Sequence, residues 1–238
     1  MKALIFAAGL GTRLRPLTDH CPKALVEVKG EPVLQHVLLA VKRAGITDVA
    51  VNVHHFADMI KAFLASNSNF GLNLHVSDES SLLLDTGGGL LRASQWLDGS
   101  EPVLLHNADI YTDLDLTRLP EDDAADATLL VSQRQSSRQL CFDSAMHLCG
   151  RVNHGNGEVL GKLTDRQFSF QGIHVVSPRI FTLLQRYSRE LACSEVFPIV
   201  PFYVWACRQP QVTISGINLT DYTWHDIGKP TSLAAANQ

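Results

Sequence analysis

The chain has 238 residues, 45% of them hydrophobic and 18% charged, a composition typical of a globular protein and not of a disordered one. This length is enough for one large buried core, so we expect a single domain over residues 1–238, without a linker or repeats. The formal net charge of −4 argues against a nucleic-acid-binding surface, which usually carries a basic excess.

The first half of the chain alternates short apolar runs with helical patterns. Strands are expected at 3–7, 48–53, 72–76 and 102–106, and helices at 32–44, 56–64 and 89–97. Such alternation is typical of parallel strands joined by right-handed crossovers. It predicts an α/β fold with a Rossmann-like, doubly wound and mostly parallel sheet.

The second half has more strands and fewer helices, which makes the predicted sheet mixed. Strands are expected at 128–132, 139–142, 146–149, 158–163, 168–176, 211–216 and 222–226. Helices are expected at 178–187, 195–208 and 231–237, the second of them despite Pro198 and Pro201.

Cysteine usage and hydropathy indicate a cytoplasmic protein without a membrane span. Five cysteines at irregular spacing, without a C-x-x-C pair, favour reduced thiols. The opening apolar run is too short for a signal peptide. The longest apolar stretch, residues 196–207, is interrupted by prolines and is too short to cross a bilayer.

A loop of small residues follows the first expected strand. Residues 7–13 read A-A-G-L-G-T-R, and Pro22-Lys23 closes the segment. Small residues let backbone N–H groups approach an anion closely. Arg13 can hold a phosphate through two hydrogen bonds, while Lys23 supplies a point charge. The residues alone predict either a phosphate-binding loop or a glycine turn beside two solvated cations, because the dinucleotide and P-loop fingerprints are both incomplete.

The full run G-x-G-T-R-L-x-P-L-T-x-x-x-P-K over residues 9–23 closely resembles the N-terminal motif of the sugar-1-phosphate nucleotidyltransferases, or NDP-sugar pyrophosphorylases. The similarity extends through nearly the whole chain. It implies that a nucleoside monophosphate passes from a nucleoside triphosphate to a sugar-1-phosphate, with release of pyrophosphate. In this resemblance Arg13 steadies the pyrophosphate and Lys23 the α-phosphate. The nucleotide-binding set then comprises Ala8, Gly9, Gly11, Thr12, Arg13 and Lys23.

Two aspartates match the metal-binding positions of the same family. Asp109 lies in N-A-D, where the family usually has N-G-D, and Asp226 lies in W-H-D-I-G-K-P, which is similar to W-x-D-I-G-T-P. The resemblance implies that both bind one Mg²⁺, which prefers carboxylate, phosphate and water oxygens. Either aspartate alone could instead cap a turn. The ten histidines fit no zinc pattern, so Mg²⁺ is the one cofactor expected.

The remaining expected contacts concern the nucleobase and the sugar. The segment D-T-G-G-G at 85–89 matches the base-binding glycine loop of the family, which implies that Gly87 and Gly88 face the nucleobase. Without this resemblance, the segment favours a glycine-rich turn that opens a helix. Asn107, Gly172 and Glu158 are the candidate contacts to the sugar-phosphate, in a sugar-binding half over about 116–238 that follows a nucleotide-binding half over about 1–115.

The substrates remain open between several alternatives. The D-T-G-G-G segment and the W-H-D-I-G ending resemble most the uridylyltransferases that act on N-acetylmuramate 1-phosphate in cell-wall recycling. Guanylyltransferases of mannose- or heptose-1-phosphate are the alternative, so UTP and GTP are the expected nucleotides. A cytidylyltransferase of a phospho-alcohol and an inactive regulatory protein that binds nucleotide-sugars are further alternatives. No hexapeptide-repeat β-helix follows Asp226, so acetyltransferase activity is not expected.

Overall fold

The computed structural model describes residues 1–120, 125–192 and 194–238. In its first half, strands and helices alternate as expected, and the strands pair in parallel in the order β6-β1-β4-β5. The strands are β1 (Lys2–Phe6), β4 (Asp48–Val53), β5 (Asn73–Asp78) and β6 (Val103–Asn107). The helices are α1 (Val33–Arg43), α2 (Ala57–Ser66) and α3 (Asp85–Leu97).

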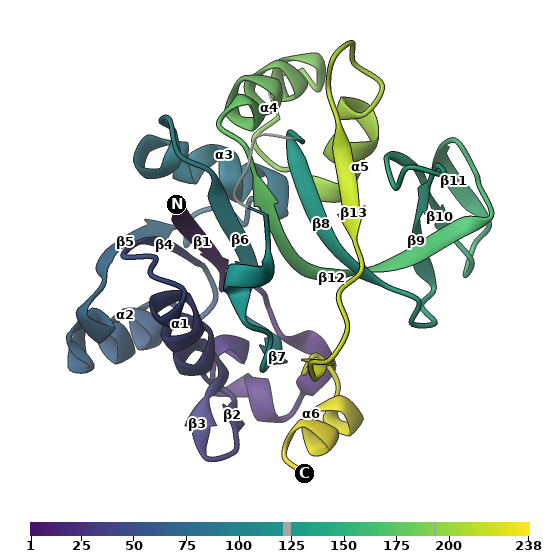
Figure 1. Ribbon diagram of the computed structural model, residues 1–238. Helices are drawn as coiled ribbons and strands as arrows, with labels where there is room; N and C mark the ends of the chain where they lie inside the picture. The colour runs from purple at the N-terminus through teal and green to yellow at the C-terminus, as the bar shows by residue number, and fades with distance from the viewer. Residues whose placement is uncertain (121–124, 193) are drawn as a thin grey trace.

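The second half extends the same sheet with strands that pair mostly antiparallel, except that β13 pairs parallel with β8. The long strand β12 (Arg166–Val176) pairs antiparallel with β6, β8 and β9, and so joins the two halves (Figure 1). The other strands are β8 (Ala127–Ser132), β9 (Arg138–Phe142), β10 (Leu148–Asn153), β11 (Glu158–Gly161) and β13 (Ile214–Ile217). The predicted mixed α/β sheet is confirmed.

Short elements lie around the ends of the sheet. They are β2 (Glu27–Val28), β3 (Glu31–Pro32), β7 (Ile110–Thr112), β14 (Trp224–Asp226), the terminal helix α6 (Pro230–Ala236), and 3-10 turns at Thr12–Leu14, Leu17–Asp19, Lys23–Leu25, Ser68–Gly71 and Leu116–Arg118. The pair β2–β3 forms a small hairpin, whereas β7 and β14 are far apart in the sequence, β7 near its middle and β14 in its last part.

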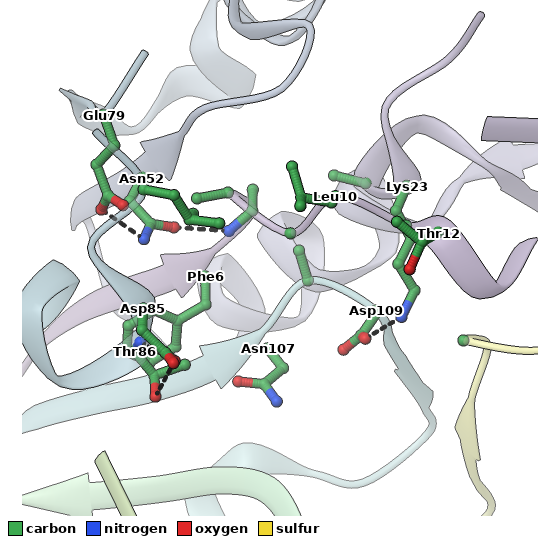
Figure 2. A pocket seen from close by; sticks show the side chains of 18 of the residues that line it. Phe6, Leu10, Thr12, Lys23, Asn52, Glu79, Asp85, Thr86, Asn107 and Asp109 are labelled. Atoms are coloured by element: carbon green, nitrogen blue, oxygen red, sulfur yellow. Dashed lines mark hydrogen bonds and ion pairs between the residues drawn. The ribbon is translucent and has the colours of Figure 1, made fainter. Parts of the chain in front are cut away.

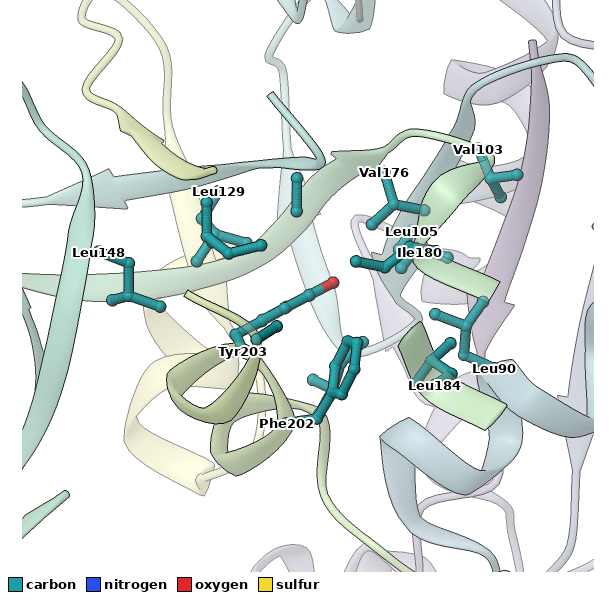
Figure 3. Packing of buried hydrophobic residues seen from close by; sticks show 14 of the residues in the cluster. Leu90, Val103, Leu105, Leu129, Leu148, Val176, Ile180, Leu184, Phe202 and Tyr203 are labelled. Atoms are coloured by element: carbon teal, nitrogen blue, oxygen red, sulfur yellow. The ribbon is translucent and has the colours of Figure 1, made fainter. Parts of the chain in front are cut away.

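Helices cover both faces of the sheet, so the side chains of β1 that point to either face are buried. Leu4 and Phe6 face a core shared with α3, α4 (Arg179–Glu190) and α5 (Ile199–Ala206). Ala3 and Ile5 face a second core formed with α1 and α2. Figure 3 shows the first core, in which Phe202 and Tyr203 of α5 pack toward Leu105 and Ile180.

Helix α5 is shorter than the expected helix over residues 195–208. It begins at Ile199 because Pro198 adopts an extended backbone at the N-cap. Pro201 is accommodated, since it lies in the first turn, where a backbone N–H has no partner within the helix. The prolines therefore set the start of this helix.

Two chain-wide expectations concern membranes and thiols. In the described residues, no helix is long and apolar enough to cross a membrane. Cys21, Cys141, Cys149 and Cys207 are free thiols, and Cys193 lies outside the described residues.

Candidate active site

A cavity of about 490 Å³ opens at the carboxyl ends of β1, β4 and β6. Parallel α/β sheets bind ligands at this edge, and the volume is within the usual range of small-molecule sites. Its wall comes from the loop over residues 7–13, from Lys23, from residues 79–86 and from residues 107–109. Figure 2 shows these segments around the cavity.

The loop after β1 forms one side of the cavity. Residues 7–13 all line it, including the predicted nucleotide contacts Ala8, Gly9, Gly11 and Thr12. Gly11 has a φ of +66°, and a Cβ atom there would lie 2.9 Å from Cγ2 of Thr18. Thr18 Oγ1 also donates to the Gly11 carbonyl at 2.8 Å, which fixes this turn. A residue with a side chain at position 11 would therefore be both strained and crowded.

The predicted cations and carboxylates converge beside this loop. Lys23 Nζ forms an ion pair with Asp109 and lies 3.9 Å from Oδ1 of Asp226 (Figure 2). A Cβ atom on Gly228 would lie 2.6 Å from Nη2 of Arg13 and 2.9 Å from Nζ of Lys23. Arg13, Lys23, Asp109 and Asp226 thus surround one point, although they come from both ends of the sequence.

Pairing of β14 with β7 brings Asp226 to this point. In the antiparallel register Asp226 is opposite Ile110, and Ile110 directly follows Asp109 in the sequence. The Ile227 N–H donates to the Asp109 carbonyl at 3.0 Å, which fixes the register beyond the strand end. The Gly228 N–H donates to Oδ1 of Asp226 at 2.8 Å and orients this carboxylate.

The donor set suits a hard cation. Asp109 and Asp226 supply carboxylate oxygens within reach of one Nζ atom, and both side chains are partly exposed. Mg²⁺ commonly takes one or two carboxylates and completes its shell with water and substrate phosphates. Within the described ranges, no group of three or more His, Cys, Asp or Glu side chains forms a closed metal cage. The two aspartates could therefore hold Mg²⁺ together with a bound nucleotide.

A buried polar pair below the cavity was not predicted. Asn52 accepts a hydrogen bond from the Ala7 N–H at 2.8 Å and donates to Glu79 Oε1 at 2.8 Å. The other oxygen of Glu79 accepts from the Leu84 N–H at 3.1 Å, and burial raises the pKa of this carboxyl group. Glu79 therefore connects the loop after β1 to the segment before α3. The signal was a polar Asn52 inside the apolar run of β4, since a buried polar group needs a partner.

The segment at residues 85–89 is helical and not a loop, because α3 already begins at Asp85, whereas the contact of Gly87 and Gly88 with a nucleobase stays a prediction. The N–H groups of Gly87 and Gly88 donate to the Phe197 carbonyl at 2.9 and 3.1 Å. Neither glycine lines the cavity, whereas Asp85 and Thr86 do. These glycines allow helix α3 to pack closely against the residues before α5.

The predicted sugar contacts are only partly brought together. Asn107 lines the cavity, and a Cβ atom on Gly172 would lie 2.6 Å from its Nδ2 atom. Gly172 has a φ of +75° and lies where the register between β12 and β8 shifts. Glu158 is elsewhere, on the edge strand β11, where its carboxylate pairs with Arg151 at 2.6 Å. The structure does not bring Glu158 to the cavity.

Two buried histidines lie in the sheet next to these residues. His106 precedes Asn107 on β6, and His174 follows Gly172 on β12. Burial lowers the pKa of His106 to about 4 and that of His174 to about 3, so both rings are neutral at pH 7. In the described part of the chain, neither ring nitrogen of His174 has a hydrogen-bond partner.

Comparisons with known proteins agree with this geometry. Residues 2–139 match the family described as "Nucleotidyl transferase". The N-acetylmuramate alpha-1-phosphate uridylyltransferase of Neisseria meningitidis serogroup B is 32% identical, over 99% of this chain and 96% of that protein. The mannose-1-phosphate guanyltransferase beta-B of Xenopus laevis is 28% identical over 97% of this chain and 62% of that protein. The structure of the inositol-1-phosphate CTP transferase from T. maritima has a TM-score of 0.75 at 16% identity, over 97% of this chain and 90% of that one.

Proposed function

Since the chain belongs to the nucleotidyl transferase family, we propose that it joins a nucleoside triphosphate to a sugar-1-phosphate, forming a nucleotide-sugar and releasing pyrophosphate. The observation that carries this proposal is the convergence of Arg13, Lys23, Asp109 and Asp226 beside the loop over residues 7–13. Two anionic substrates that react with each other need cations at the point of reaction, which Arg13 and Lys23 supply, and the two carboxylates could hold a metal ion that adds further positive charge.

The reaction is a substitution at the α-phosphorus of the triphosphate. An oxygen of the sugar phosphate forms the new P–O bond, and the bond to the β-phosphate oxygen breaks. Lys23 neutralises charge near the α-phosphate and the attacking oxygen, whereas Arg13 binds the departing pyrophosphate. The residues supply positioning and charge neutralisation, and the reaction needs no covalent intermediate with the protein.

Mg²⁺ is the proposed cofactor, and Asp109 and Asp226 are its proposed ligands. When bound, it neutralises phosphate charge and polarises the reacting phosphoryl group. The Lys23 ammonium lies beside both of these carboxylates. We therefore expect Lys23 to exchange its carboxylate partners for phosphate oxygens when nucleotide and metal bind.

The proposed substrates are UTP and N-acetylmuramate 1-phosphate. The support is the N. meningitidis relative and a second protein of the same name from Caulobacter vibrioides, which is 31% identical over 85% of this chain and 89% of that protein. A guanylyltransferase of mannose-1-phosphate is the second candidate, because the X. laevis relative aligns with 97% of this chain.

Pyrophosphate release tests the proposal. The purified protein is incubated with Mg²⁺ and each of UTP, GTP, CTP, ATP and dTTP against N-acetylmuramate, N-acetylglucosamine, mannose and heptose 1-phosphates and phosphocholine. We expect release with UTP and N-acetylmuramate 1-phosphate, and none with Lys23→Ala or Asp109→Asn. The exposed Lys29→Ala is the matched control, since its side chain makes no ion pair with a described residue. If no pairing released pyrophosphate, the chain would be a binding protein and the proposal would fail.

A further inference from the structure

Arg134 is a cation beside the proposed active site that the reaction described above does not use. Its Cζ atom lies 4.4 Å from the centroid of the Trp224 ring, over the aromatic face. A guanidinium group is attracted to such a face, and it keeps its N–H donors available at the edge. Among the described residues, no hydrogen bond or ion pair engages this guanidinium, and only the backbone carbonyl of Arg134 accepts hydrogen bonds.

Trp224 is itself held in place, so the platform under Arg134 is rigid. The indole Nε1 donates to the Gln171 carbonyl at 3.0 Å, at the irregular part of β12 next to Gly172. The Tyr222 hydroxyl donates to Oε1 of Gln171 at 2.5 Å, which fixes this residue from the other side. The arrangement orients a cation with unused donors, and a ligand would find these donors already in position.

The position of Arg134 relative to the reacting groups follows from β14. Trp224 and Asp226 are two residues apart on this strand, so their side chains point to the same face, about 7 Å apart. Partial burial lowers the pKa of Arg134, and the negative charge of Asp226 acts in the opposite direction. Arg134 is thus near enough for the charge of Asp226 to act on it, and the Trp224 ring beneath it contacts β12 at Gln171, next to Gly172.

We propose that Arg134, held on Trp224, recognises a carboxylate group on the ring of the acceptor sugar, an inference that rests on the proposed function. The acceptor phosphate already has a cation of its own, since Lys23 is assigned to the α-phosphate and the attacking oxygen. A second cation, Arg134, matches a second anionic group, across the sugar ring from the phosphate. The planar fork of arginine fits a carboxylate through two parallel hydrogen bonds. N-acetylmuramate carries such a group in its lactyl ether, whereas N-acetylglucosamine lacks it.

Calorimetric titration with these two 1-phosphates, without nucleotide, tests the inference. The acceptors differ only in the lactyl ether. We expect the wild-type protein to bind N-acetylmuramate 1-phosphate more tightly, and Arg134→Gln to weaken that binding about 10- to 100-fold, as for a charge-assisted hydrogen bond. Binding of N-acetylglucosamine 1-phosphate should change by less than about twofold. Arg138→Gln, an exposed arginine at the start of β9, is the control and should bind as wild type.

Two results would overturn the inference: equal wild-type affinity for both acceptors, or equal weakening of both by Arg134→Gln. The pyrophosphate assay separates this from the proposed function. Preferential binding without any pyrophosphate release would defeat the proposed activity alone, and release without preferential binding would defeat the role of Arg134 alone. In an active enzyme, the variant should raise KM for the carboxylated acceptor far more than it lowers kcat.

Discussion

The contact of α3 with the residues before α5 offers the sharpest test of the packing, because two physical effects predict opposite signs for Gly88→Ala. Helix propensity favours alanine over glycine inside a helix by about 1 kcal/mol. Packing disfavours it, because a Cβ atom on Gly88 would lie 1.9 Å from the Glu195 carbonyl oxygen and 3.1 Å from the Leu84 Cβ.

The structure indicates that packing prevails. The Glu195 carbonyl belongs to the backbone and would have to move by about 1.5 Å to reach the ordinary contact distance of 3.4 Å. This movement would strain the two hydrogen bonds from Gly87 and Gly88 to the Phe197 carbonyl, worth about 1 kcal/mol each. Overpacking adds about 1–3 kcal/mol. After subtraction of the helix-propensity gain, we expect the free energy of unfolding to fall by about 2–4 kcal/mol.

Urea unfolding followed by circular dichroism measures this change. Gly99→Ala is the matched control, since a Cβ atom there has only the end of Lys2 as a neighbour, 3.9 Å away. The control should stay within about 0.5 kcal/mol of wild type. If Gly88→Ala unfolded at the same urea concentration as wild type, or at a higher one, the close packing of α3 on residues 195–197 would be refuted.

Three more predictions concern the sheet and the site. Between pH 7 and pH 5, the unfolding free energy of wild type should fall by about 2 kcal/mol for each buried histidine, His106 and His174. The reason is that a histidine of the unfolded chain binds a proton near pH 6.5, whereas the folded rings do so only near pH 3–4. In urea melts at several pH values, His174→Leu should flatten this dependence, whereas the exposed His20→Gln should not. Gly172→Ala should raise KM for the sugar-1-phosphate at least about tenfold in initial-rate assays. Residue 172 has a φ of +75°, and a Cβ atom there would displace the Asn107 amide. An unchanged KM would remove this contact from the acceptor site. Chelation by EDTA should abolish pyrophosphate release, and added Mg²⁺ should restore it. The Asp226→Asn variant should need a higher Mg²⁺ concentration than wild type for its half-maximal rate. Activity that survives chelation would contradict a metal role.

The element order was predictable from the sequence because the periodicities are strong. The expected strand at residues 48–53 coincides with β4, and α1 lies within the expected helix at 32–44. Predictions were poorer where polar residues interrupt the pattern. The strand expected at 146–149 lies at Leu148–Asn153, because β10 alternates buried residues with glycine, arginine and asparagine, which gives little apolar signal.

The site was predictable in its residue types but not in its contacts. Arg13, Lys23, Asp109 and Asp226 were identifiable from motifs, yet their approach depends on pairing between β7 and β14, which no local pattern specifies. Two further contacts could not be predicted either, because each joins residues that are far apart in the sequence. The path of Glu79 to the loop runs through Asn52, and the stacking of Arg134 on Trp224 joins residues from distant strands.

The pairing of β7 with β14 has a consequence for how the protein matures. Asp226 reaches Asp109 only through β14, a strand that a ribosome translates long after β7. A nascent chain that has emerged only as far as β13 could already form the parallel strands, but it would lack half of the carboxylate pair. The proposed reaction would then have to wait until β14 has been made and has paired with β7, and fragments that lack β14 would lack one of the two proposed metal ligands.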